Sequence, residues 1–235
     1  MISAKEKPTR TALSIQILPD GFCVFKPSVY DRLDRVFLNP QEELLLWLSQ
    51  ESLTDTPLKL IYSGPATLVP GELFSAADAS DYLKYHIEDW AHTAFTELKN
   101  FELFVVFAHN QKLESGLKDA HYSITVTHSA HELLKRALVS PNKEIPRLVS
   151  IFHPKHIELV YHKGPNLLVY NQFAIEGDLD ASYYLQLALR TTKQPESTTD
   201  VICYENGSNW GAVSFKHVNE WASDAQYITE VYPFH

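Results

Sequence analysis

The feature that most restricts how this chain can fold is a pattern of residues that occurs twice. A constant shift along the chain relates the two copies, so that Leu13 matches Leu148. The same shift relates Pro19 to Pro154 and Phe22 to Ile157. In each copy, alternating apolar residues predict a strand that enters a proline-containing turn, a second strand and then a third. An apolar helix and a short strand ending near glycine follow in both. Hairpins and amphipathic helices are common, so an accidental match is the alternative, but the shared order favours an internal duplication.

The first copy is expected to hold three strands, a buried helix and a fourth strand. Asn39 and Pro40 suit a helix cap and first turn. The helix body is apolar on nearly every side, which predicts burial. The expected strands cover 13–18, 22–25, a segment within 33–38, and 58–62, and the helix body covers 43–48.

Further helices and strands are expected between the two copies and within the second. Ser75 with Asp78, and Ser129 with Glu132, have the spacing of capping boxes at helix starts. Apolar residues at helical spacing follow Ser129 and predict a helix face turned toward the core. The remaining expected elements are a central strand over 101–107, a helix over 183–189, and a strand that begins near Ile202.

These elements divide the chain into four segments. The polar residues 1–10 are interpreted as a leader, and a proline-rich break separates two larger units. The length suits one large domain or two smaller ones. The predicted organisation is a leader at 1–10, a first half at 11–140, a linker at 141–146 and a shorter second half at 147–235.

Charge and cysteine content narrow the partners and the compartment. The formal net charge of −9 disfavours nucleic acid and anionic membrane surfaces as partners. No apolar run is long enough for a membrane span, and the start of the chain lacks a signal-peptide pattern. Cys23 and Cys203 each lie in an apolar run and are expected to be reduced and buried in a cytoplasmic protein. A disulfide between them is the alternative.

The order of elements is that of two tandem ribonuclease-H-like halves of the β-β-β-α-β-α type. The chain resembles bacterial proteins of unknown function that adopt an actin-like ATPase fold. The resemblance is carried by Leu13-Ser-Ile with Asp20-Gly21-Phe22, by the segment Leu68–Phe74, and by the strand Phe101–Phe107. It extends from about residue 11 to the end. It implies an α/β fold with mixed sheets, and the family has no established activity to transfer.

The resemblance also implies where a nucleotide would bind. Actin-like ATPases hold ATP and Mg²⁺ between their halves, on two Asp-x-Gly hairpins and a Gly-Gly pair. Here the first hairpin has adjacent Asp20 and Gly21, and the second has Pro154-Lys155-His156. The adenosine position has a single glycine. The nucleotide-binding candidates are Asp20, Gly21, Asn206, Gly207 and Ser208.

Each of these segments also has a simpler interpretation. Asp-Gly favours a tight hairpin turn, which needs no phosphate. The second hairpin could hold an anion through Lys155, and a solvated turn is the alternative. The chain has only eight glycines and no Gly-x-Gly, so the common glycine-rich phosphate loops are absent from the sequence.

Metal binding and hydrolytic catalysis have less support in the sequence. The histidines lack the spacing of a zinc site, so no metal is expected. His128 is interpreted as a helix cap and His131 as a helix-surface residue, while His153 and His156 flank a turn and His162 lies further along the next strand. No Gly-x-Ser-x-Gly elbow occurs. Asp178 with Asp180 is interpreted as a helix start, and Asp31 with Asp34 as a solvated loop, rather than as catalytic pairs.

Tyrosines are frequent in the second half, and this residue type is enriched at protein interfaces. Core packing explains most of them, and the exposed remainder could form a contact surface. The sequence thus predicts a cytoplasmic, non-catalytic protein that acts through an unidentified protein partner and needs no cofactor. The alternative is an ATP-binding or ATP-hydrolysing protein that uses Mg²⁺ in the cleft between its halves. No catalytic residue is assigned.

Overall fold

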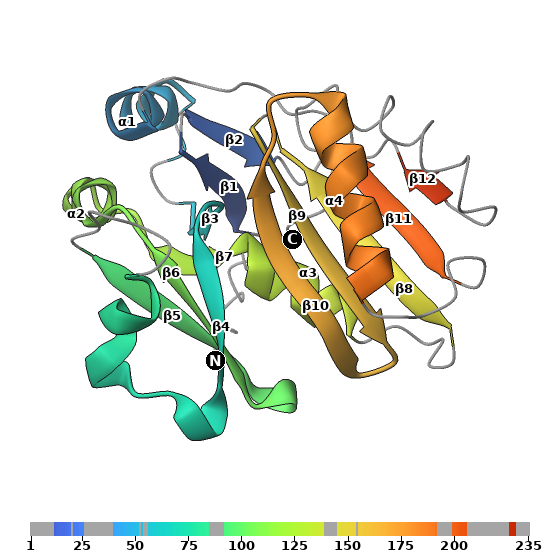
Figure 1. Ribbon diagram of the computed structural model, residues 1–235. Helices are drawn as coiled ribbons and strands as arrows, with labels where there is room; N and C mark the ends of the chain where they lie inside the picture. The colour runs from blue at the N-terminus through green and yellow to red at the C-terminus, as the bar shows by residue number, and fades with distance from the viewer. Residues whose placement is uncertain are drawn as a thin grey trace, which may run out of the picture.

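The structure is a computed structural model that describes residues 12–19, 21–25, 40–51, 53, 56–84, 92–138, 145–153, 155–191, 199–205 and 226–228. Three sheets make up the described part (Figure 1). The predicted leader and residues 141–144 of the predicted linker lie outside the described residues. Pro146, expected in the linker, is already paired with Lys163 at the start of a strand.

The first sheet has four strands in the order β2-β1-β3-β7. Antiparallel pairing of β1 with β2 confirms the predicted hairpin, and β3 and β7 add parallel strands beside β1. The strand predicted within 33–38 lies outside the described residues. The four strands are β1 (Leu13–Leu18), β2 (Gly21–Phe25), β3 (Leu58–Tyr62) and β7 (Ile124–His128).

The second sheet has five strands in the order β10-β9-β8-β11-β12 and repeats this pairing pattern. β8 pairs with β9 in antiparallel fashion and with β11 in parallel fashion. Ile17 faces Phe22 in one hairpin, and Phe152 faces Ile157 in the other. These pairs are related by the shift found in the sequence. The strands are β8 (Pro146–Phe152), β9 (His156–Lys163), β10 (Asn166–Ala174), β11 (Asp200–Glu205) and β12 (Gln226–Ile228).

A small third sheet lies between β3 and β7 in the chain, in the order β4-β6-β5. Its middle strand confirms the central strand predicted from the apolar run, although Phe101 lies in a short 3-10 turn before it. The strands are β4 (Ala66–Pro70), β5 (Thr93–Leu98) and β6 (Leu103–Ala108). The 3-10 segments are η1 (Gly71–Leu73), η2 (Ala76–Tyr82) and η3 (Lys99–Phe101).

Four α-helices lie in the described part: α1 (Pro40–Gln50), α2 (Gln111–Asp119), α3 (Ser129–Ala137) and α4 (Asp178–Thr191). The expectation that α1 is buried on nearly every side is wrong, because Leu46 is 59% exposed. Leu44 and Leu48 are fully buried. The apolar stripe of α3 is buried as predicted, from Ala130 to Leu138.

Both predicted capping boxes are wrong. Ser75 precedes a 3-10 segment, and its backbone N–H binds the Tyr82 hydroxyl at 2.9 Å, so it has no need of a carboxylate partner. At α3 the cap is His128, whose Nδ1 accepts from the Ala130 N–H at 3.0 Å. This confirms the interpretation of His128 as a cap.

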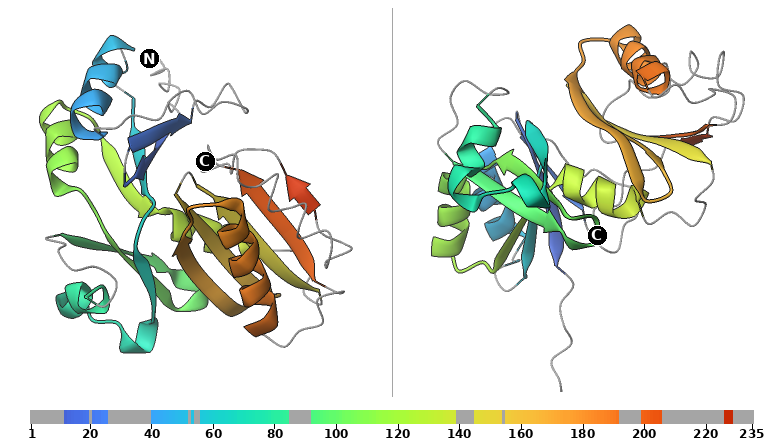
Figure 2. Two further views of the ribbon diagram at one scale, coloured as in Figure 1. Left: turned by 45° about the horizontal axis from the view of Figure 1, so that its top comes forward. Right: turned by 60° about the horizontal axis from the view of Figure 1, so that its bottom comes forward.

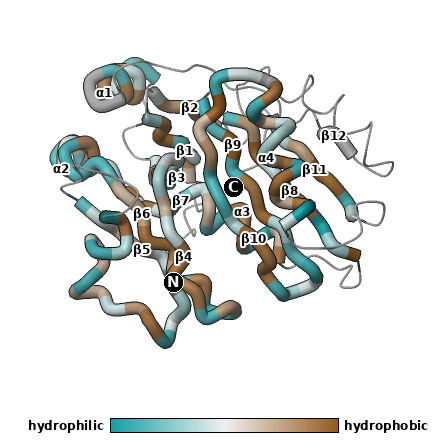
Figure 3. The backbone as a smooth tube through the Cα atoms, in the orientation of Figure 1, coloured by the Kyte–Doolittle hydropathy of each residue, from teal (hydrophilic) through white to brown (hydrophobic). Residues whose placement is uncertain are grey.

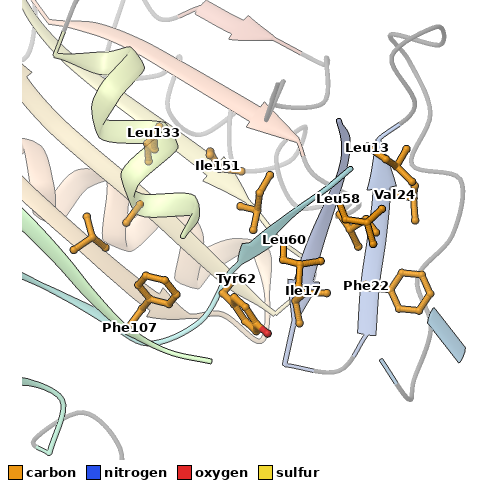
Figure 4. Packing of buried hydrophobic residues seen from close by; sticks show 14 of the residues in the cluster. Leu13, Ile17, Phe22, Val24, Leu58, Leu60, Tyr62, Phe107, Leu133 and Ile151 are labelled. Carbon is orange, nitrogen blue, oxygen red and sulfur yellow. The ribbon is translucent and has the colours of Figure 1, made fainter. Parts of the chain in front are cut away.

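One hydrophobic core joins the first and second sheets. Ile151 and Val149 of β8 and Val160 of β9 belong to the same buried cluster as β1, β3 and α3. Figure 4 shows Ile151 close to Leu133 and to residues of the first sheet. The strands of the second sheet carry long hydrophobic stretches (Figure 3). Helix α3 lies between the two sheets, while α4 covers the opposite face of the second (Figure 2). This packing brings the β1–β2 and β8–β9 hairpins together.

Candidate functional site

Most residues predicted to hold a nucleotide lie outside the described part of the chain. These are Asp20, Asn206, Gly207 and Ser208. Gly21 is described: it is the first residue of β2, is buried and faces Leu18 across the hairpin. At the other hairpin, the His153 N–H donates to the His156 carbonyl at 2.9 Å, and Lys155 is exposed at the turn.

Buried polar side chains from both sheets meet where the two hairpins approach each other. Gln16 of β1 donates through Nε2 to the Ser63 hydroxyl at 2.6 Å. The same Nε2 lies 3.2 Å from His153 Nδ1, which follows β8. Gln16 and His153 are fully buried, and Ser63 is 4% exposed. A hydrogen-bonded bridge therefore links the two sheets and is closed to solvent.

The bridge continues to a buried carboxylate in the second sheet. His153 Nε2 lies 3.4 Å from Glu158 Oε2, and the His153 and His156 rings stack with centroids 4.1 Å apart. Oε1 of Glu158 accepts from the Tyr170 hydroxyl at 3.0 Å and from Gln172 Nε2 at 3.1 Å. Since Gln16 donates to Nδ1, these contacts fit a His153 with its proton on Nε2. We call Gln16, Ser63, His153, Glu158, Tyr170 and Gln172 the bridge cluster.

The environment of Glu158 keeps it ionised. Burial alone would raise its pKa, but the hydrogen bond from His153 and the nearby histidines outweigh burial and lower the pKa to about 2. Burial, followed by the same carboxylate, raises the pKa of Tyr170 well above its usual value. The bridge cluster thus contains one buried anion that its neighbours hold with several donors.

Burial disfavours the charged form of two nearby histidines, His128 and His156. Burial is the main cause that lowers the pKa of His128 to about 4, against the opposing effect of Glu158. Its Nε2 lies 3.2 Å from the Gly64 carbonyl, and its Nδ1 accepts from Ala130, which requires the proton on Nε2. Burial and His153 also hold the pKa of His156 well below its usual value.

His162 and His131, also interpreted as non-ligands, each have one ring nitrogen in contact with a polar atom, and the buried Nε2 of His162 has no hydrogen-bond partner among the described residues. His162, which lies near the end of β9 as predicted, is buried with its Nδ1 3.0 Å from the Gly164 carbonyl. His131 is half-buried rather than on the open helix surface and contacts Thr127 and Glu132. Among the described residues, no group of three or more His, Cys, Asp or Glu could hold a metal ion.

Two cavities lined by described residues border the hairpins. One of about 330 Å³ lies between them, lined by Pro19, Gly64 to Ala66, Lys155 and His156, and by Asn171 to Ala174 of β10. The other, of about 630 Å³, lies at the ends of β1, β3 and β6 and the start of α2. We call the latter the α2 cavity. It is lined by Ile17 to Pro19, Tyr62 to Pro65, His92 and Ala108 to Lys112.

The α2 cavity is mainly apolar, and its charged lining is cationic. Among the described residues that line it, Lys112 is the only Lys, Arg, Asp or Glu. Two of its lining residues contact one carboxylate. Tyr62 donates to Glu114 Oε1 at 3.1 Å, and His109 Nδ1 lies 2.6 Å from the same oxygen. A shallow hollow along α2 continues from Lys112 toward Asp119.

Sequence reasoning missed Gln16, Ser63 and Glu158. The available signal was a large polar residue between two apolar ones within a strand: Gln16 between Ile15 and Ile17, and Glu158 between Ile157 and Leu159. All six residues of β1 are buried, so neither face of this strand is open to water. A buried Gln or Glu requires partners, but the sequence does not show that these partners lie on the other sheet.

Comparisons with known proteins agree with this architecture. A Bacteroides thetaiotaomicron protein with an actin-like ATPase fold and unknown function superposes with a TM-score of 0.77, at 12% identity, over 94% of this chain and 91% of the other. A second similar structure, a PilM–PilN type IV pilus biogenesis complex, gives a TM-score of 0.56 at 11% identity, over 94% of this chain and 89% of that one. The search of curated proteins found no match.

The chain therefore has an actin-like ATPase fold, as the sequence resemblance implied. A family model, DUF3822, described as a protein of unknown function, matches residues 57–216. The chain belongs to this family. In the described part, no helix is both long and apolar enough to cross a bilayer.

Proposed function

We propose that this protein is a cytoplasmic, non-catalytic module that acts by binding another protein. The observation that carries the proposal is the bridge cluster. Gln16, His153 and Glu158 are fully buried between the two hairpins, the place where the resemblance puts the phosphates of a nucleotide. Side chains of the protein itself occupy part of the space there, beside the cavity of about 330 Å³.

The buried charge between the two hairpins supports the same proposal. Glu158 is an anion whose two oxygens already accept hydrogen bonds from His153, Tyr170 and Gln172. A polyphosphate brought near it would meet like charge in a poorly hydrated environment, where repulsion is strong.

The α2 cavity is the surface we propose for the partner. Its apolar lining and its cationic Lys112, on a protein of net charge −9, fit an apolar segment that carries an acidic residue. The continuing hollow along α2 suits an extended segment rather than a small molecule. The PilM–PilN structure, in which a protein of similar fold is part of a protein complex, supports this type of function.

Calorimetric titration with Mg-ATP tests the non-nucleotide part of the proposal. No binding heat is expected from the full chain at micromolar nucleotide. Binding with micromolar affinity would contradict the proposal.

Partner capture from a bacterial lysate tests the surface with two charge reversals on one helix. Lys112→Glu changes the α2 cavity, and Lys118→Glu changes an exposed residue of α2 that does not line it. A partner retained by the wild type and Lys118→Glu but lost by Lys112→Glu is the expected result. Retention by both variants would contradict the α2 cavity as the docking surface.

A second candidate function is ATP binding between the two hairpins. It is favoured by the cavity of about 330 Å³ there and by the exposed Lys155 that lines it. This function requires that Lys155→Ala and Asp20→Ala each weaken Mg-ATP binding. If binding occurred and neither variant changed it, ATP would not be held at this position.

A further inference from the structure

Strand β10 ends the second sheet and has one edge without a neighbouring strand. It is paired with β9 on one side, and no described strand lies on the other. The strand, Asn166–Ala174, contains no charged residue and no proline. Its one irregular position lies between Leu167 and Val169, so the later half is regular. Proteins usually protect an exposed edge with charges, proline or bulges, and the later half of β10 has none of these.

The later half of β10 presents backbone hydrogen-bonding groups at the open edge. The Ile175 N–H donates to the Lys155 carbonyl at 3.0 Å, across the hairpin to β9. Because inward and outward groups alternate along an antiparallel strand, the backbone groups of Gln172 and Ala174 point away from β9. The Gln172 N–H binds the side-chain oxygen of its exposed neighbour Asn171 at 2.8 Å. No described backbone group accepts from the Ala174 N–H.

The open edge of β10 borders the smaller of the two cavities. Asn171 to Ala174 line this cavity of about 330 Å³, together with Gly64 to Ala66 at the start of β4. Figure 1 shows β10 on the side of the second sheet that is turned toward β4. Space is therefore present beside the backbone groups that a further strand would bind.

The smaller cavity adjoins the α2 cavity. Pro19, Gly64 and Pro65 line both of them. Among the described residues that line the two cavities, the only Lys, Arg, Asp or Glu are Lys112 in the α2 cavity and Lys155 in the smaller one. Both lysines are exposed. Two cations without a carboxylate, in a protein of formal net charge −9, favour an acidic occupant along both cavities.

We propose that the partner segment in the α2 cavity continues past Pro65 and adds a strand to the open edge of β10. This inference rests on the proposed function and specifies the chemistry of the partner. The segment is extended and carries acidic residues that meet Lys112 and Lys155. Beyond Pro65, its backbone pairs with that of Gln172 and Ala174. In strand addition, main-chain hydrogen bonds supply affinity and side-chain contacts supply selectivity, so the α2 cavity selects the partner and β10 holds it.

Short peptides selected against the full chain from a random phage-displayed library provide the probe. Fluorescence anisotropy of a labelled synthetic peptide measures its affinity. Ala174→Pro removes one outward N–H at an edge position, where proline is tolerated, and should weaken binding by about tenfold. Ala174→Val keeps this N–H and is the matched control, which should bind like the wild type. Lys155→Glu should also weaken binding of an acidic peptide.

Two further measurements separate this inference from the proposed function. N-methylation of alternate peptide amides removes their donors and should weaken binding by about tenfold, even if circular dichroism shows that Ala174→Pro is misfolded. Lys112→Glu tests the α2 cavity itself and should also weaken binding.

The outcomes of these measurements are distinct. Binding that Lys112→Glu abolishes, but that Ala174→Pro and N-methylation leave unchanged, would overturn strand addition and leave the proposed docking surface intact. Binding that Lys112→Glu leaves unchanged would contradict the α2 cavity and, with it, the continuous segment. A selection that yields no binding peptide would overturn both.

Discussion

The β1–β2 and β8–β9 hairpins have the same backbone register and different polar residues. Gln16 faces Cys23 in the first, whereas Ile151 faces Glu158 in the second. The polar residue is on the first strand of one hairpin and on the second strand of the other. Because the two hairpins pack together, Gln16 and Glu158 reach opposite sides of His153. The difference shows that two hairpins with equivalent backbones can each supply part of one buried hydrogen-bond network.

Among the changes to the two hairpins, removal of the charge of Glu158 in the second should lower the free energy of unfolding most. Glu158→Gln is expected to lower the free energy of unfolding by about 3 kcal/mol, because the donors from His153, Tyr170 and Gln172 would each lose a charge-assisted hydrogen bond. Urea unfolding measures the change. Glu97→Gln alters an exposed carboxylate on β5 and should change stability by less than about 0.5 kcal/mol. Equal effects of both variants would show that the bridge cluster is not stabilising.

The polar residue of the first hairpin should matter less because it is neutral. Gln16→Leu keeps the volume and leaves the Ser63 hydroxyl and His153 Nδ1 without this donor, which is expected to cost about 2 kcal/mol. The effects of Gln16→Leu and Glu158→Gln should not add in the double variant, because both act through His153. Strict additivity in a double-mutant cycle would show that Gln16 and Glu158 are not coupled through His153.

Acidification should lower the free energy of unfolding through His128, next to the first sheet, and through Glu158, in the second. The pKa of His128 is about 4 in the folded state against 6.5 for an ordinary histidine, so the unfolded chain takes up its proton first as pH falls below 6.5. This alone should cost about 2 kcal/mol between pH 7 and pH 5. Below pH 4.5 the lowered pKa of Glu158 adds a further loss.

Urea unfolding at the two pH values measures this effect. His128→Gln should remove about 2 kcal/mol of the difference between pH 7 and pH 5. His92→Gln, which replaces an exposed histidine, controls for the loss of one imidazole. An unchanged pH dependence in His128→Gln would contradict the role of this residue.

The smallest expected effect concerns the glycines that end strands. A Cβ at Gly64 would meet nothing within 4 Å, so Gly64→Ala should change stability by less than about 0.5 kcal/mol. A Cβ at Gly71 would lie 3.0 Å from the Glu102 carbonyl, and Gly71→Ala should cost about 1–2 kcal/mol. Thermal unfolding compares the two. A large cost at Gly64 would show that the turn beside both cavities is tighter than the structure indicates.

Much of the fold could be predicted because local patterns specify it. The alternation in β1, the turn at Pro19 and Gly21, and the helical stripe of α3 each produced the expected element. The capping boxes failed because their spacing is a local signal that other side chains can satisfy. Tyr82 binds the Ser75 amide and His128 caps α3, and neither belongs to the pattern that predicts a capping box.

The candidate site could be predicted only in part. The place of Gly21 in the hairpin and the flanking of a turn by His153 and His156 follow from the sequence. The partners of Gln16 and Glu158 do not, because His153 lies 137 residues from Gln16. No pattern of spacing reports a contact between two sheets at such a separation.

The sequence by itself determined the strands of the two hairpins and their repeated register, the helices α1, α3 and α4, and the burial of Cys23 and Cys203. These features depend on residue periodicity and turn chemistry, which act over a few neighbouring residues. The tertiary structure alone decided that polar side chains of two sheets close the junction, that Glu158 stays ionised there, and that the open edge of β10 borders a cavity. These depend on which surfaces pack together, because burial and hydrogen-bond partners are properties of the assembled core.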